Sequence, residues 1–175
     1  MFSSEKEYEN YLVTTLKKGP ECKGVWIVDP ITGAREEIWK YLQDLPYEVI
    51  QDNTNWKSHE GISPDLIGGM VPDIVVNSKI SNQNRILIEV KWEAKLNYGL
   101  DDSQLARYFL YLLSATTIKH KDAKDLKRAV LLAAPQRWYK GKNSDIFNHF
   151  VDRLYKIGEA FEIKIGKIEC DALET

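Results

Sequence analysis

VPDIVVNSKISNQNRILIEVKW, residues 71–92, has a clear pattern of two β-strands separated by a polar turn. Residues 74–76 and 85–90 are rich in β-branched and aliphatic side chains, which favour β-strands. The polar run between them, residues 77–84, is typical of a multi-residue turn. Together these runs predict an antiparallel β-hairpin.

The hairpin brings charged side chains together at one end. If its turn is centred near Ser81, Asp73 at the start of the first strand lies roughly opposite Glu89 near the end of the second. Side chains alternate along a strand, so Glu89 and Lys91 project from one face while Val90 points into the core. The sequence therefore predicts two carboxylates with an adjacent ammonium group.

Such a group suits hydrolysis of a phosphodiester. That reaction needs a hard cation to neutralise the phosphate, and Mg²⁺ accepts carboxylate oxygens together with waters. We expect Asp73 and Glu89 to be the metal ligands. Lys91 is the candidate that orients or deprotonates an attacking water and stabilises negative charge in the transition state.

The residues before the hairpin predict two helices, a short apolar stretch, a strand and a long loop. Apolar spacing over 4–18, with Ser4 as the N-cap, indicates a helix. A short apolar stretch covers 25–28, a second helix is expected over 35–45, and 47–51 is typical of a strand. The polar run 52–69 predicts a loop of the kind that often carries function.

The residues after the hairpin predict two helices and two strands. Helical periodicity covers 101–119 and 144–160. The apolar run 129–134 is typical of a parallel strand that is buried on both faces, and the alternation over 161–168 indicates an edge strand. No repeat or linker interrupts the chain, so we expect one α/β domain over residues 1–175.

Composition restricts the class of protein. The formal net charge is −2 and the pI is near 6.0, so any contact with nucleic acid must come from local basic patches. The two cysteines, Cys22 and Cys170, match no zinc or disulfide pattern. No run is long and apolar enough to cross a bilayer, and the charged N-terminus is unlike a signal peptide. We expect a soluble, cytoplasmic protein without a membrane partner.

Pro72-Asp73, followed after a gap by Glu89-Val90-Lys91, resembles the PD-(D/E)XK motif of restriction-endonuclease-like nucleases. The resemblance implies an αβββαβ core, in which a mixed central sheet is flanked by helices. It also implies a metal-dependent nuclease, with DNA as the favoured substrate and Mg²⁺, replaceable by Mn²⁺, as the cofactor. The implied metal-binding residues are Asp73, Glu89 and Val90, and Lys91 is implied to be catalytic.

Two further elements are similar to members of this family. Gln104 and Tyr108 form a Q-x-x-x-Y element like that of RecB-like nucleases and share one helical face, so the resemblance implies a catalytic Gln104 and a substrate-contacting Tyr108. Glu9 matches a glutamate that many members place near the metal, with Glu5 as the substitute candidate. Two cysteines are too few for the four-cysteine iron–sulfur cluster of some RecB-like nucleases.

A cationic and aromatic run is the candidate contact with nucleic acid. Residues 137–142 interleave Arg137, Lys140 and Lys142 with aromatic side chains, a composition suited to phosphate contact and base stacking. A solvated loop with anchoring aromatic side chains explains the same run equally well.

Each motif also has a structural interpretation. A single Pro-Asp pair is common in turns, a single Glu-x-Lys pair is usually solvated charge, and Tyr108 and Gln104 fit a core and a boundary position. Only their combination favours a nuclease. A nuclease fold that binds or regulates without cutting is the rival from another class. A homodimer or a partner protein that supplies targeting also stays open.

Overall fold

The computed structural model describes residues 2–43, 46–51, 71–79, 85–93, 98–99, 102–115, 127–142 and 144–173. Seven strands within these ranges form one mixed sheet, in the order β2-β1-β9-β8-β5-β4-β3. The strands are β1 (Val25–Val28), β2 (Arg35–Glu37), β3 (Tyr47–Gln51), β4 (Ile74–Ser78), β5 (Arg85–Val90), β8 (Arg128–Ala133) and β9 (Ile163–Cys170). A separate pair joins β6 (Tyr98–Gly99) to β7 (Asp102–Ser103).

The predicted hairpin is confirmed. β4 and β5 are antiparallel, and their partners, from Ile74 with Ile88 to Asn77 with Arg85, are centred on position 81. β4 extends to Ser78, two residues beyond the predicted strand, and residues 80–84 lie outside the described part of the chain. The predicted strand over 47–51 is confirmed as β3, which pairs antiparallel with β4.

The buried parallel strand is also confirmed. All six residues of β8 are buried, and β8 runs parallel to both β5 and β9. The prediction that residues 161–168 form an edge strand is wrong, because β9 lies between β8 and β1. β1 pairs antiparallel with β9, from Val25 with Cys170 to Val28 with Lys167, and β2 extends the sheet beyond β1. The polar residues of β9 misled the prediction, since alternation is equally compatible with a central strand of this curled sheet.

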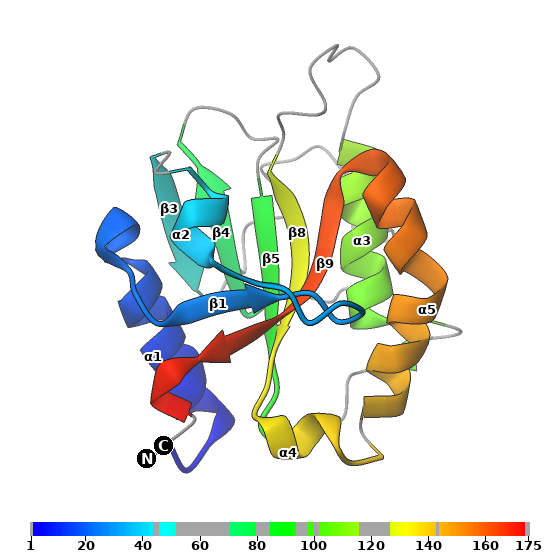
Figure 1. The fold of residues 1–175 in the computed structure, drawn as a ribbon, viewed down its shortest axis with the longest axis horizontal. Coiled ribbons are helices and arrows are strands. Elements are labelled where there is room, and N and C mark those ends of the chain that lie inside the picture. Colours follow the sequence, from blue (N-terminus) through cyan, green and yellow to red (C-terminus); the bar gives the residue numbers. More distant parts are fainter. Residues whose placement is uncertain are drawn as a thin grey trace.

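Helices cover both faces of the sheet (Figure 1). α1 and α2 pack on one face, and α3 and α5 pack on the other. The helices are α1 (Glu5–Leu16), α2 (Ile38–Tyr41), α3 (Gln104–Ala115), α4 (Gln136–Tyr139) and α5 (Ser144–Phe161), with 3-10 turns η1 (Gly19–Glu21) and η5 (Asp171–Leu173). The chain is thus an α/β protein with a mixed sheet flanked by helices.

Two helix predictions need correction. The helix expected over 35–45 is largely wrong, because residues 35–37 form β2 and the helix that follows is the single turn α2. β2 forms there because Arg35 and Glu37 pair with β1, a long-range contact that local propensity does not contain. The helix expected over 101–119 begins at Gln104, after β7. Residues 116–119 and the loop expected over 52–69 lie outside the described residues.

The first and last helices agree with the sequence. Ser4 caps α1, and its hydroxyl accepts a hydrogen bond from the backbone N–H of Glu7. α5 covers the whole predicted helix and ends one residue later. None of the helices in the described ranges is both long and apolar enough to cross a bilayer.

Alternation along β5 divides the core in two. Ile86, Ile88 and Val90 pack in the cluster beneath α1. Leu87 packs in the cluster beneath α3 and α5, so Glu89 points toward the α3 face as well. The end of β5 therefore lies between α1, which covers one face of the sheet, and α3, which covers the other.

Candidate active site

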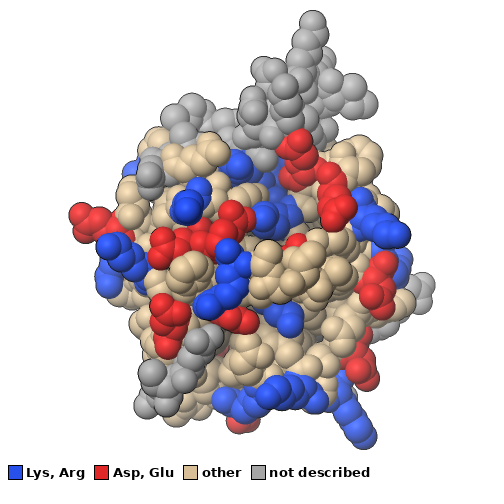
Figure 2. All heavy atoms as spheres, viewed as in Figure 1, with Lys and Arg blue, Asp and Glu red and all other residues tan. Residues whose placement is uncertain are grey.

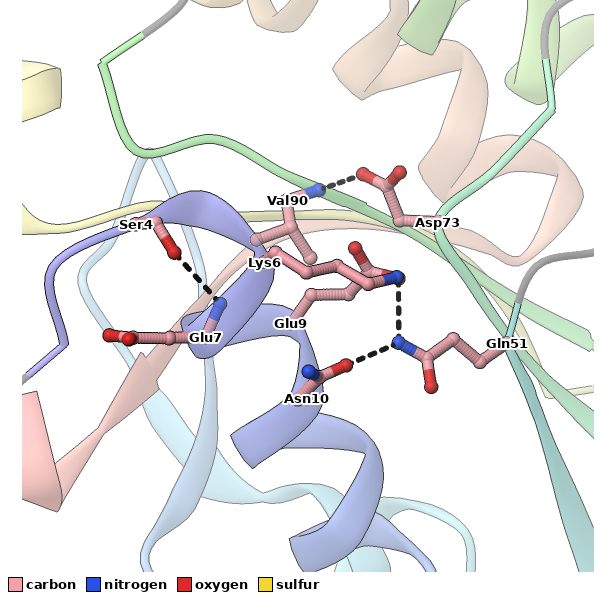
Figure 3. A network of polar contacts seen from close by, with 8 residues as sticks. All are labelled: Ser4, Lys6, Glu7, Glu9, Asn10, Gln51, Asp73 and Val90. Atoms are coloured by element: carbon pink, nitrogen blue, oxygen red, sulfur yellow. Dashed lines mark hydrogen bonds and ion pairs between the residues drawn. The ribbon is translucent and has the colours of Figure 1, made fainter.

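Asp73 is fixed at the end of the β4–β5 ladder. The last residue pair of that ladder joins Ile74 to Ile88, which leaves the next backbone donor of β5 on that side, Val90 N–H, without a strand partner. The Asp73 carboxylate Oδ2 accepts a hydrogen bond from Val90 N at 2.8 Å (Figure 3). Asp73 is only partly buried, so part of this residue at the strand ends is accessible to solvent.

Glu89 is held from both sides. Lys91 Nζ lies 3.2 Å from Glu89 Oε1, and the Tyr108 hydroxyl of α3 donates a hydrogen bond to Glu89 Oε2 at 3.1 Å. Gln104 Nε2 in turn donates to the Tyr108 oxygen at 3.3 Å. All four side chains are buried, Glu89 with only 3% of its surface exposed. The Q-x-x-x-Y pair therefore reaches the glutamate of the strand motif.

Burial makes both carboxyl groups hold protons more tightly than exposed ones. The pKa of Glu89 is raised to about 8, first by burial and then by the charge of Asp73, while Lys91 and Tyr108 oppose the shift. The pKa of Asp73 is raised to about 6 by burial and by Glu9, against the hydrogen bond from Val90 and the charge of Lys91. A nearby cation would stabilise the ionised forms of two buried carboxyl groups that repel each other.

α1 brings two further carboxylates to the same strand ends. Glu5 Oε2 accepts a hydrogen bond from the backbone N–H of Trp92 at 3.1 Å, directly after Lys91. One turn later, buried Glu9 accepts from Gln51 Nε2 at 2.9 Å and pairs with Lys6 at 3.3 Å (Figure 3). The negative charge of Glu9 also raises the pKa of Asp73, so the two carboxyl groups interact electrostatically.

The donor set is compatible with Mg²⁺. In the described ranges no group of three or more His, Cys, Asp or Glu side chains is arranged as a metal site. Mg²⁺ commonly needs only one or two protein carboxylates, with waters and substrate phosphate completing its shell. Asp73 and Glu89 meet that requirement, and their pKa values stay raised by burial although Lys91 opposes both shifts.

Comparisons with known proteins give no relative. No protein-family model, curated protein or solved structure matches this chain. The chemistry of the site therefore rests on its own geometry.

The cationic run after β8 forms the short helix α4 and the turn that follows it. Arg137, Lys140 and Lys142 are exposed, as nucleic-acid contacts would be. In Figure 2, Lys and Arg side chains gather along the lower edge of the molecule, where α4 lies in Figure 1. The Arg137 guanidinium lies 4.3 Å from the centre of the Trp92 ring, so α4 borders the end of β5.

The aromatic residues of this run serve as anchors. Trp138 is buried, and the Tyr139 hydroxyl donates to the Leu132 carbonyl of β8 at 2.9 Å. Neither ring is therefore free to stack on a base. Tyr108 is fully buried too, which does not support the prediction that it contacts nucleic acid. It lies instead behind Glu89.

Sequence reasoning missed Gln51 and gave Glu5 only a secondary place. Gln51 ends β3 and pairs with Ile74, so it lies beside the start of the Asp73 strand. It had a detectable signal: a polar side chain at the end of the strand predicted over 47–51. Its partner in α1, Glu9, was found only through the family resemblance.

Proposed function

We propose that this chain is a metal-dependent nuclease that hydrolyses phosphodiester bonds in DNA. The observation that carries the proposal is the placing of Asp73, Glu89 and Lys91 at one end of adjacent strands, with Lys91 Nζ 3.2 Å from Glu89. The order of α1, β3 to β5, α3 and β8 along the chain agrees with an αβββαβ core. β1, β2 and α2 are then an insertion after the first helix.

Each residue has a distinct task in this proposal. Asp73 and Glu89 would hold Mg²⁺ or Mn²⁺, with the main chain of Val90 alongside and Glu9 acting from α1. The cation, when bound, supplies positive charge that neutralises the phosphate and favours ionisation of water. Lys91 orients the nucleophile and stabilises charge that develops on the phosphate oxygens.

Gln104 and Tyr108 are positioning residues. The buried chain of hydrogen bonds from Gln104 through Tyr108 fixes one oxygen of Glu89 and leaves the other to Lys91. Because the Tyr108 hydroxyl donates to the ionised carboxylate, it favours the state of Glu89 that can bind a cation. Arg137, Lys140 and Lys142 then supply the local positive charge that an overall acidic chain needs to hold DNA.

Cleavage of DNA by the purified chain tests the proposal. Labelled linear, circular and branched DNA would be incubated with Mg²⁺ or Mn²⁺, with EDTA as the metal-free control. We expect metal-dependent cutting that Asp73→Asn and Lys91→Met abolish. Asp152→Asn and Lys156→Met, two exposed changes on α5, are matched controls that keep the activity.

Two outcomes would overturn the assignment. In one, the folded wild type cuts none of the DNA substrates with either metal. In the other, Asp73→Asn and Lys91→Met cut as fast as the two α5 controls. If the wild type still binds DNA in the first case, the chain is a nuclease-fold binding module.

A further inference from the structure

A pocket of about 350 Å³ opens at the ends of β8 and β9. Among the described residues its walls are apolar at Ala134, Pro135, Cys170 and Leu173, and polar at Gln136 and Glu169. Its volume is at the lower end of the range for small-molecule sites, and a largely apolar wall with a few polar groups is typical of such sites.

The pocket and the active site share one edge of the sheet. Val90 at the end of β5 pairs with Ala133 of β8, which pairs with Ile168 of β9. Ala134 and Glu169 are the next residues of the latter two strands, so the pocket lies two strands away from the end of β5. At the usual strand spacing this is about 10 Å.

Arg137 connects the wall of the pocket to the residues that follow β5. Arg137 follows Gln136 of the pocket, and its guanidinium lies over the ring of Trp92, which follows Lys91. Arg137 is exposed, so its guanidinium remains accessible to a phosphate. A short stretch of single strand can therefore place one phosphate near Asp73 and Glu89, another against Arg137, and a base in the pocket.

The polar side chains in the pocket suit the edge of a base. Gln136 Nε2 donates to Glu169 Oε1 at 2.9 Å, and Arg35 lies 3.6 Å from the other oxygen of Glu169. An amide and a carboxylate supply the donors and acceptors that recognise base edges elsewhere in proteins. The apolar wall supplies a surface against which an unpaired base can pack.

We propose that this pocket binds the base of an unpaired nucleotide close to the scissile phosphate. The inference rests on the proposed nuclease function and specifies its substrate class. A base in a duplex is stacked and paired, and extracting it costs free energy, so the pocket favours single strands, overhangs and frayed ends. The substrate is therefore DNA with an unpaired nucleotide at the cleavage site.

Cleavage rates on three matched substrates test this inference: a single strand, a blunt duplex and a duplex with an unpaired overhang. We expect the wild type to cut the single strand and the overhang about tenfold faster than the blunt duplex. Leu173→Trp, which fills the pocket, and Gln136→Ala should both remove this preference. Ile157→Trp, which adds an indole at an exposed site of α5, should keep it.

Binding is measured separately from cutting. A single-stranded oligonucleotide carrying 2-aminopurine would be titrated into the Asp73→Asn protein, and its fluorescence would report entry of the base into the pocket. Adding Leu173→Trp or Gln136→Ala should weaken this binding about tenfold. Gln136→Ala is an exposed change, so the test does not depend on the folding of the Leu173→Trp variant.

The results separate the two proposals. Metal-dependent cutting with equal rates on the blunt duplex and the single strand contradicts base binding in the pocket but supports the nuclease function. An unchanged preference in both pocket variants does the same. If no substrate is cut but the pocket variants lose oligonucleotide binding, the pocket stands and the nuclease function fails.

Discussion

The Tyr108 hydroxyl donates a hydrogen bond to Glu89 Oε2 across 3.1 Å, which links α3 to the end of β5. Tyr108 is fully buried, and this bond lowers the pKa of a carboxyl group that burial raises. The same hydrogen bond connects a tyrosine of the core to the Glu-x-Lys motif of β5. The bond makes the ionisation of Glu89 sensitive to a single hydroxyl group.

Tyr108→Phe should therefore move the pH dependence of cleavage. Without the donor the pKa of Glu89 rises further, so the acid limb of the pH–rate profile should shift upward by about one pH unit. The ring stays in the core, and the circular dichroism spectrum should not change. Tyr155→Phe on α5 is the matched control. It also removes a tyrosine hydroxyl that donates to a carboxylate, but the acceptor is Asp29, which is not a residue of the candidate site. An unshifted profile in Tyr108→Phe would contradict the role given to the bond.

The effect of Mg²⁺ on stability should increase with pH. Both carboxyl pKa values are higher in the folded chain, about 6 for Asp73 and about 8 for Glu89, than the values near 4 in an unfolded chain. Their contribution to stability is therefore fully present below about pH 4 and is lost as the pH rises through these folded values. Bound Mg²⁺ offsets that loss, because it binds the ionised carboxylates.

Thermal unfolding with and without Mg²⁺ measures this linkage. The increase in Tm on adding Mg²⁺ should be small at about pH 5.5 and larger at about pH 8.5. Asp73→Asn should reduce the increase at the higher pH. A Tm increase that is the same at both pH values would show that these carboxyl groups do not bind the ion.

Glu9→Gln should weaken metal binding without unfolding the chain. Glutamine has nearly the same shape but no charge, so the hydrogen-bonded contact with Gln51 can be retained while the negative charge near Asp73 is lost. We expect the Mg²⁺ concentration for half-maximal cleavage to rise about tenfold. Glu48→Gln, an exposed change on β3, should leave it unaltered. Equal Mg²⁺ dependence in both variants would remove Glu9 from the site.

Gly158→Ala should destabilise the fold although alanine is the better helix former. A Cβ at Gly158 would lie 2.5 Å from the carbonyl oxygen of Ile163, where α5 passes the start of β9. Helix propensity favours alanine by about 1 kcal/mol, whereas a backbone clash of this kind costs about 1–3 kcal/mol. Urea unfolding should show a net loss of stability. At Gly141 an added Cβ meets nothing closer than 3.7 Å, so Gly141→Ala should not show this loss.

Local pattern was enough to predict the elements that hold the candidate site. β-rich runs on either side of a polar gap predicted the hairpin, and its register followed from the position of the gap, which is why Asp73 and Glu89 were expected to face each other. The apolar run of β8 predicted a strand buried on both faces. In each case the signal lies in neighbouring residues, where side-chain periodicity reflects burial directly.

Tertiary pairing decided the rest. Residues 35–37 pair with β1 instead of forming a helix, and β9 is a central strand because β1 pairs with it. Neither pairing can be read from the local sequence pattern. The contacts of Tyr108 with Glu89, Gln51 with Glu9 and Arg137 with Trp92 likewise join separate elements. The residue types and their spacing were enough to predict which residues have the chemistry of the site. Only the packing of α1, α3 and α4 around the strand ends decided which of them meet, because hydrogen bonds and ring contacts act over a few ångströms and depend on the folded chain.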